Sequence, residues 1–242
     1  MMEENVPEKP PIPVPESAGK VHEYILEELK KLLHLQVSDC LNTEFRSGFS
    51  RILDLFEEYQ CLIIDEYGSA MSCARGCSWC CNHWVEDVNS FEAEIIADYI
   101  RKNHPAQISQ IVKQCKNDLI LLENLDDIVS QKVPENGLDD GNDSVFILLS
   151  SFYQLKRPCP LLDANGGCSI YPVRPLTCRV YMSFSSSKNC HPTNINQEDI
   201  PTYIMDLREE ANELVDKLHF RFQKYEDDTG LRSLLVKYLG DL

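Results

Sequence analysis

The sequence predicts a mostly α-helical fold, in which a helical scaffold carries irregular cysteine-rich loops. Apolar residues recur at helical spacing through most of the chain, and the cysteines gather in stretches between these segments. No alternation of strand and helix patterns and no internal repeat is visible in the sequence. A chain of 242 residues can form one ordinary core, so we expect a single helical domain over residues 19–242.

The first residues are expected to form a disordered tail. Residues 1–18 are rich in proline and charge and hold few large apolar groups, so burial cannot offset the entropy that ordering costs. From Val21 onward the apolar residues follow a helical stripe, and a second stripe begins at Phe49. Two amphipathic helices should therefore follow the tail.

Three more helices are predicted further along the chain. Asn89 lies three residues before Glu92, a pattern typical of a helix N-terminus, and Pro105 should end that helix near His104. The apolar spacing resumes after Pro105 in a second helix, and residues 207–222 give a long amphipathic third one.

Two stretches between these helices are less regular. An acidic surface loop is predicted for KVPENGLDDGND. The apolar run that follows it is SVFILLSSFYQL, whose period fits a buried helix or a strand and does not choose between them.

The charge of the chain limits its partners. With 39 acidic and 23 basic residues the formal net charge is −16, which argues against nucleic acid and would suit a basic protein partner. The balance reverses locally in residues 156–190, which hold five basic residues and one acidic residue.

The cellular location is predicted from the absence of a secretory signal pattern and of a membrane-spanning pattern in the sequence. The N-terminal MMEENVPEKPPIPVPES lacks the basic start and apolar run of a secretory signal, and no apolar stretch reaches the ~20 residues that span a bilayer. We therefore expect a cytoplasmic protein without a membrane partner. Because cytosolic thiols stay reduced, the eleven cysteines favour metal binding or catalysis over disulfides, which are the alternative.

The first cysteine cluster, CARGCSWCC, holds Cys73, Cys77, Cys80 and Cys81. In a helix all four would share one face, and in a loop Gly76 would let the chain wrap around one centre. In extended chain the neighbouring side chains of Cys80 and Cys81 would point to opposite sides. These two cysteines could therefore serve different centres.

A second cysteine group lies downstream in rigid loops. Pro158 and Pro160 fix the backbone around its first member, and the turn Asn165-Gly166-Gly167 precedes its second. Its members are Cys159, Cys168, Cys178 and Cys190. Four plus four thiols match two four-coordinate metal ions, or one larger iron-sulfur assembly with spare thiols.

Other residues near the cysteines have two interpretations each. Arg174 and Arg179 could hydrogen-bond sulfur and neutralise the charge of a cofactor, or form plain surface ion pairs. His83 and His191 could be further ligands or polar surface residues. The three cysteines outside the clusters are expected to be small buried residues within helical stripes: Cys40, Cys61 and Cys115.

These residues resemble the CxxCxxCC or YkgJ-type cysteine-cluster family of zinc- or iron-chelating domains, which includes flagellin lysine N-methylase. The resemblance covers about residues 70–190 and rests on CARGCSWCC, VEDVNSFEAEIIADYIR, CPLLDANGGCSIYPVRPLTCR and the later Cys190. It implies that the eight clustered cysteines are the family's eight. The first gap, however, holds three residues where the family name shows two.

Three functions follow from the pattern and the resemblance. The first is a metal-binding protein that holds iron, as ions or as an iron-sulfur cluster such as 4Fe-4S, or zinc, through the eight cysteines in a closed structural or redox site. The second is an enzyme, because the methylase branch implies methyl transfer to protein lysines with an iron-sulfur centre and S-adenosylmethionine. The third is a module for metal delivery or redox sensing.

The first cluster also imitates the three-cysteine signature of radical S-adenosylmethionine enzymes, through Cys73, Cys77 and Cys80. Those enzymes are similar in fold to β/α barrels, which require the strand and helix alternation that this chain lacks. No residue is singled out as catalytic.

Overall fold

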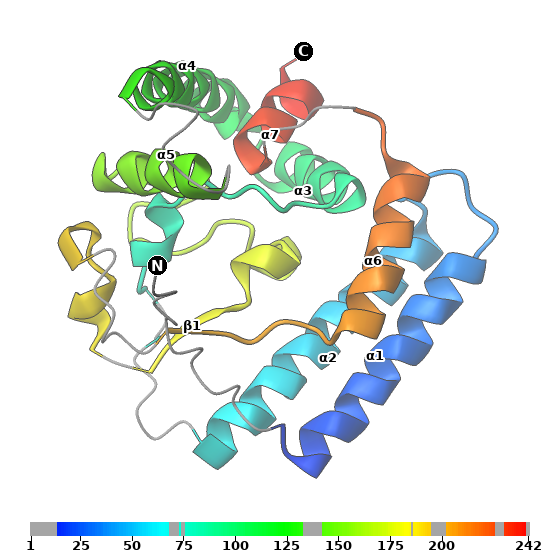
Figure 1. The fold of residues 1–242 in the computed structure, drawn as a ribbon. Helices are drawn as coiled ribbons and strands as arrows, with labels where there is room; N and C mark the ends of the chain where they lie inside the picture. The colour runs from blue at the N-terminus through cyan, green and yellow to red at the C-terminus, as the bar shows by residue number, and fades with distance from the viewer. Residues whose placement is uncertain are drawn as a thin grey trace.

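The computed structural model describes residues 14–67, 73, 76–132, 142–184, 186–194, 202–225 and 230–240, and the structural statements below concern these residues. Helices dominate this part of the chain, which confirms the predicted mostly α fold (Figure 1). The helices and strands are α1 (Glu16–His34), α2 (Thr43–Tyr67), α3 (Ser90–Asn103), α4 (Ile108–Lys132), α5 (Asn142–Gln154), β1 (Tyr181–Ser183), β2 (Thr202–Ile204), α6 (Glu209–Phe222) and α7 (Leu231–Leu239).

One group of helices consists of α1, α2 and α6, which lie side by side (Figure 1). Their facing stripes bury Ile25, Phe56 and Leu218 completely, and this packing confirms the two amphipathic helices predicted after the tail. Because α1 begins at Glu16, the last residues of the expected tail are helical. Residues 1–13 lie outside the described part of the chain.

A second group of helices consists of α3, α4 and α7, whose buried residues share one core. Ile96 and Ile100 of α3 face this group, whereas Phe91 and Ile95 face the first one, so α3 belongs to both cores. The loop residues of the second cysteine group also contribute, since Ile170 is buried against the same helices. The two cores are thus joined through one shared helix and the cysteine-bearing chain.

The predicted ends of α3 are confirmed. The side chain of Glu92 accepts a hydrogen bond from the backbone N–H of Asn89 at 3.1 Å, as a capping box requires. The helix ends at Asn103, and a single 3-10 turn, η2 (Pro105–Gln107), leads into α4. The last amphipathic helix, α6, begins two residues later than its apolar pattern suggested.

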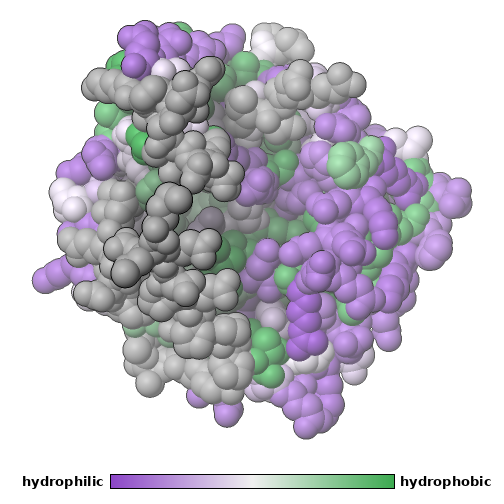
Figure 2. Space-filling view, in the orientation of Figure 1, coloured by the Kyte–Doolittle hydropathy of each residue, from purple (hydrophilic) through white to green (hydrophobic). Residues whose placement is uncertain are grey.

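The ambiguous apolar run folds as the helix α5. Most of the acidic loop predicted before it, residues 133–141, lies outside the described part of the chain. The two strands pair antiparallel, with Tyr181 opposite Ile204. None of the described helices is long and apolar enough to cross a membrane. Figure 2 shows a mostly hydrophilic surface over α1, α2 and α6, in keeping with the excess of acidic residues.

Candidate metal centre

The described residues of the first cysteine segment are Cys73 and residues 76–81, and they lead into one 3-10 turn, η1 (Trp79–Asn82). Gly76 has a φ of 90°, a conformation that L side chains rarely adopt, so glycine is needed where the chain bends. The N–H of Cys81 donates to the carbonyl of Ser78 at 3.1 Å and closes the turn. Because a 3-10 helix has three residues per turn, the neighbouring side chains of Cys80 and Cys81 point in different directions.

The second cysteine segment follows α5 as a chain of tight turns. The Asp163 carboxylate accepts the N–H groups of Asn165 and Gly167 at 2.7 and 2.8 Å, and Gly166 has a φ of 76°. This reversal confirms the predicted Asn165-Gly166-Gly167 turn and leads into Cys168. Rigid backbone therefore carries this thiol.

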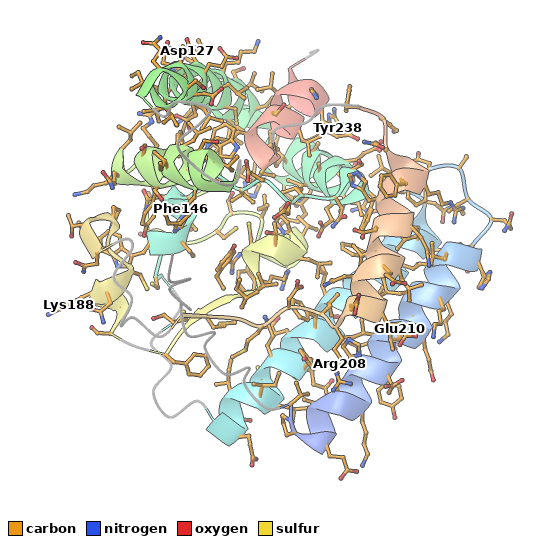
Figure 3. All side chains as sticks on the ribbon, viewed as in Figure 1. Asp127, Phe146, Lys188, Arg208, Glu210 and Tyr238 are labelled. Atoms are coloured by element: carbon orange, nitrogen blue, oxygen red, sulfur yellow. The ribbon has the colours of Figure 1, made fainter. Side chains whose placement is uncertain are left out.

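Further 3-10 turns carry the other thiols of the second segment. Cys178 is the last residue of η4 (Leu176–Cys178), and Cys190 is the last residue of η5 (Ser187–Cys190). In Figure 3 the η5 segment lies at the edge of the molecule, where Lys188 points outward. The other turns of this segment are η3 (Tyr171–Val173) and η6 (Pro192–Asn194).

Backbone hydrogen bonds join the two cysteine segments. The N–H of Cys159 donates to the carbonyl of Cys81 at 2.7 Å, which places these two cysteines side by side. The N–H of Ser183 donates to the sulfur of Cys73 at 3.2 Å. The two cysteine segments, which are far apart in the sequence, therefore meet in space.

Aromatic rings cover the same junction. The Trp79 ring lies edge-on to the His191 ring, with centroids 4.7 Å apart, and the His83 ring stacks on Tyr153 at 3.7 Å. The Tyr153 hydroxyl donates to the carbonyl of Cys190. Both histidines thus make other contacts in the structure, and the metal ligation predicted for them stays a prediction.

The eight clustered thiols form a continuous group. Each sulfur lies within electrostatic range of at least one of the others. Within the described residues, however, no three of these sulfurs lie mutually within 4.8 Å. Four thiolates around one zinc ion at ~2.3 Å would stand about 3.8 Å apart. The thiol donors therefore suit a soft metal, while their spacing is more open than a single ion requires.

The thiol of Cys80 has a lowered pKa. A hydrogen bond from the Cys81 thiol is the main cause that lowers the pKa of Cys80 to about 6, and the charge and hydrogen bond of Arg174 act in the same direction. The hydrogen bond correspondingly raises the pKa of Cys81. The lowered pKa of Cys80 favours its thiolate, the form that binds metal.

Arg174 is the cation at the centre of the second group. Its half-buried guanidinium lies within electrostatic range of Cys178, Cys80, Cys81 and Cys168. Loss of four thiol protons would leave negative charge here that this single arginine partly balances. The role of Arg174 in binding a cofactor stays a prediction.

Arg179 occupies a different position. Its guanidinium donates to the carbonyl oxygens of Arg174 and Tyr171 at 2.8 and 3.0 Å, and its own carbonyl accepts a hydrogen bond from Gln60 of α2 at 2.9 Å. The buried Arg179 side chain thus fixes the turn that presents Arg174. A direct contact of Arg179 with sulfur stays a prediction.

A buried ionic network holds both cysteine segments against α4 and α7. Asp118 accepts hydrogen bonds from Arg232 at 3.0 Å and from Arg157 at 2.8 Å. Arg232 also donates to the carbonyl oxygens of His83 and Arg157 at 3.2 and 3.4 Å, close in sequence to Cys81 and to Cys159 respectively. The side chains of Asp118 and Arg232 are 0% and 1% exposed.

Sequence analysis missed this network. One signal was present, because Asp118 shares the buried stripe of α4 with Ile111 and Cys115, at helical spacing. An acidic residue on an apolar stripe indicates a buried partner. The partner itself, Arg232, lies far away in the sequence and could not be identified by spacing.

The approach of α7 to the first segment depends on Gly230. The N–H of Leu231 donates to the carbonyl oxygen of Val85 at 2.9 Å. Gly230 has a φ of 96°, and a Cβ atom there would lie 2.1 Å from the same oxygen. Only glycine fits this position without moving the helix.

Glu92 connects α3 to the second segment. Its fully buried carboxylate accepts the N–H of Leu176 at 2.8 Å as well as that of Asn89. Burial raises the pKa of Glu92, and these hydrogen bonds oppose the shift. The same residue thus caps a helix and positions the turn that ends at Cys178.

The three cysteines outside the clusters differ in their surroundings. Cys40 and Cys115 are buried as predicted, and burial raises the pKa of Cys115 to about 12. The prediction that Cys61 is buried was wrong, because its side chain is exposed. The inward positions of α2 near it are taken by Gln60 and Ile63 instead.

One other set of possible ligand atoms is present in the described part of the chain. Ligand atoms of Asp39, Cys40 and Glu94 lie within 4.8 Å of one another. The Cys40 thiol already donates to Glu94 at 3.3 Å, and Lys224 forms an ion pair with the same carboxylate. The Glu94 carboxylate is therefore already paired with the Cys40 thiol and with Lys224.

Comparison with known proteins gives one match. The model of the CxxCxxCC family, described as "Putative zinc- or iron-chelating domain", matches residues 72–203, a stretch that includes both cysteine segments. Neither the curated proteins nor the solved structures contain a match to the chain.

Proposed function

Because the chain belongs to the CxxCxxCC family of zinc- or iron-chelating domains, we propose that it binds iron or zinc through its eight clustered cysteines. The observation that carries this proposal is the junction of the two segments, where Cys81 and Cys159 are joined by a backbone hydrogen bond. The proposed ligands are Cys73, Cys77, Cys80, Cys81, Cys159, Cys168, Cys178 and Cys190.

The spacing of the thiols favours an iron-sulfur cluster over single zinc ions. A cluster places its own iron and sulfide between the cysteines, so its thiolates stand further apart than those of one ion. The sulfurs of the described cysteines do not reach the closeness of a zinc site. A bound iron-sulfur cluster would supply one-electron redox chemistry, or would stabilise the loops by linking their cysteines.

The protein's own residues would act on the bound group in two ways. The hydrogen bond from Cys81 lowers the pKa of Cys80, which favours the thiolate that coordinates metal. Arg174 would donate hydrogen bonds towards sulfur and partly balance the negative charge. The Arg179 guanidinium would hold Arg174 in place by donating a hydrogen bond to the backbone carbonyl oxygen of Arg174.

The alternatives rest on weaker support. Lysine methylation with S-adenosylmethionine is suggested by the resemblance alone. The described residues contain two strands of three residues each, and they do not form the β/α barrel to which radical S-adenosylmethionine enzymes are similar. Metal delivery or redox sensing is favoured by the exposure of Cys80. Cytoplasmic location stays a prediction.

Anaerobic purification of the full chain from cells supplied with iron and zinc tests the proposal. We expect stoichiometric metal by elemental analysis, and, for the iron-sulfur form, acid-labile sulfide and a brown colour. Cys178→Ser should lose metal, whereas Cys61→Ser, which removes an exposed thiol outside the clusters, should keep it. Metal-free wild-type protein, or full metal content in Cys178→Ser, would contradict metal binding by these cysteines.

A further inference from the structure

The surroundings of the helix α5 change along its length. Phe152 and Tyr153 near its C-terminal end are 0% and 3% exposed, whereas Val145 and Phe146 near its N-terminal end are 46% and 54% exposed. Each exposed residue precedes one of the buried residues by about two helical turns, so all four lie on one face of the helix. The face that packs into the protein at one end is therefore uncovered at the other.

The uncovered end of α5 lies beside the second half of α4. The two helices pack against each other, and Figure 1 shows them side by side. Arg157 donates to Asp118, and Gln114 donates to the carbonyl oxygen of Pro158, both at 2.8 Å. Both contacts join the first half of α4 to the chain that closely follows α5. The helices therefore run antiparallel, and the C-terminal half of α4 lies along the N-terminal half of α5.

The second half of α4 is also apolar and incompletely covered. Ile111 and Cys115 in its first half are buried, whereas Leu121 and Leu125 are only partly buried and Ile128 is 47% exposed. Neither of the two cores includes a residue from the second half of α4 or from the described side chains of α5. We call this part of the molecule, residues 121–131 of α4 and 144–149 of α5, the hairpin end.

The charges at the hairpin end are all negative. Glu123, Asp126 and Asp127 are exposed, and none of them forms an ion pair with a residue that the structure describes. Figure 3 shows Asp127 at the outer edge of the molecule. The hairpin end contains no basic residue, and in the sequence the connecting residues 133–143 hold four acidic residues and no basic one. Negative charge alone therefore surrounds the exposed apolar side chains.

We propose that the hairpin end is a docking surface for a basic amphipathic segment of a partner protein. The apolar side chains of that segment would cover Ile128, Val145 and Phe146, and its Lys or Arg residues would pair with Asp126 and Asp127. An exposed apolar patch with a polar rim is typical of a protein interaction site, and complementary charge selects the partner. The hairpin end contains no cysteine, so this proposal does not depend on metal binding.

The charge of the surface argues against other occupants. A second copy of the chain in a symmetric contact would bring Asp126 and Asp127 of both copies to the same interface, where like charges repel. Nucleic acids and anionic membranes are repelled for the same reason. A positively charged protein segment is the occupant that pairs with both the apolar residues and the acids.

The helix α5 joins this surface to the cysteine segments. The Tyr153 ring stacks on His83, and its hydroxyl donates to the carbonyl oxygen of Cys190. Phe146 lies about 10 Å from Tyr153 along the helix axis, because each residue of a helix rises ~1.5 Å. The docked partner would therefore contact the helix that holds Cys190 in place.

A labelled synthetic helix made only of leucine and lysine, with the leucines on one face, is the probe. Fluorescence anisotropy should show that the full chain binds it, and that binding weakens as NaCl is raised. Val145→Ser/Phe146→Ser should weaken binding about tenfold, because the apolar contact is lost. Phe220→Ser is the matched control and should leave the affinity unchanged, since it removes a 70% exposed apolar side chain from α6.

A second pair of variants separates the local charge from the net charge of the chain. Asp126→Asn/Asp127→Asn should weaken binding about twofold to tenfold at low salt, because two ion pairs are lost. Glu213→Gln/Asp216→Asn removes two exposed acidic residues of α6 and should leave the affinity unchanged, although the net charge changes equally. Equal effects of the two double variants would show that only the net charge attracts the probe, and would overturn the proposal.

Other results would also overturn it. These are no binding by the wild type, full affinity in Val145→Ser/Phe146→Ser, and equal binding of a probe in which glutamate replaces lysine. Light scattering should show a monomer, and a dimer that Phe146→Ser abolishes would make a second copy the occupant instead. Circular dichroism should show native helix content in each variant. If Val145→Ser/Phe146→Ser has lost helix, Phe146→Gln alone decides by the same criterion.

Discussion

At the scale of single residues, Cys80 and Cys61 show that surroundings set the chemistry of an exposed thiol. Both side chains are exposed. The hydrogen bond from Cys81 lowers the pKa of Cys80, whereas the partial desolvation of Cys61 by its neighbours and the negative charge of Glu57 raise the pKa of Cys61. Of these two thiols, Cys80 is the better nucleophile at neutral pH in the metal-free protein.

This difference predicts a pH dependence of alkylation. In metal-free protein the reaction of Cys80 with iodoacetamide should increase as pH rises through about 6 and then level off, because the thiolate is the reacting form. The reaction of Cys61 should keep increasing at higher pH. Mass spectrometry of the modified peptides at a series of pH values gives both curves.

Arg174→Ala should move the Cys80 curve to higher pH, because the thiolate loses its cation. At pH 5, below both midpoints, we expect a roughly threefold slower reaction, because about tenfold less thiolate is partly offset by its higher intrinsic nucleophilicity. Arg51→Ala, which removes an exposed arginine of α2, is the matched control and should leave the curve in place. An unchanged midpoint in Arg174→Ala would show that this arginine does not act on Cys80.

At the scale of elements, the network around Asp118 holds α4, α7 and the two cysteine segments together. The guanidinium of Arg232 also lies over the rings of Trp84 and Phe152, at 5.1 and 5.2 Å. A buried ion pair gives little net stability over apolar residues, but removal of one partner leaves the other charge unpaired. The network therefore matters most when it is broken.

Asp118→Ala should destabilise the protein by about 3–5 kcal/mol, because it leaves Arg232 charged and buried. Urea denaturation followed by circular dichroism measures the change. Lys30→Ala breaks the exposed ion pair with Glu210 and should cost less than about 1 kcal/mol. Equal effects of the two substitutions would contradict the special position of Asp118.

At the scale of the whole molecule, regular helices surround chain that has little regular structure of its own. Residues 157–194 contain only 3-10 turns and one strand of three residues among those described. Such chain gains order chiefly from side-chain contacts and from any bound metal. The core formed by α1, α2 and α6 does not include the clustered thiols.

Metal removal should therefore act unevenly. After chelation, hydrogen-deuterium exchange should rise strongly in peptides from residues 157–194 and change little in α1. Chelator added to Cys178→Ser, which lacks a proposed ligand, should cause a smaller change. A uniform increase along the chain would show that metal stabilises the fold as a whole.

Features that depend on residues close in the chain could be predicted from the sequence, whereas features that depend on distant contacts could not. The helices, the cap at Asn89 and the turn at Asn165 could be predicted, because each depends on residues close in the chain. The exposure of Cys61 and the partner of Asp118 depend on which helix face meets which neighbour. Local spacing does not contain that information, and it likewise could not show which cysteines lie side by side.

The close approach at Gly230 has a consequence for any study of this site. A side chain at that position would collide with the carbonyl oxygen of Val85 and push the C-terminal helix outward, together with Arg232. The loop that presents the vicinal thiols would then lose its anchor, although every sulfur donor is intact. A variant without metal need not have lost a ligand.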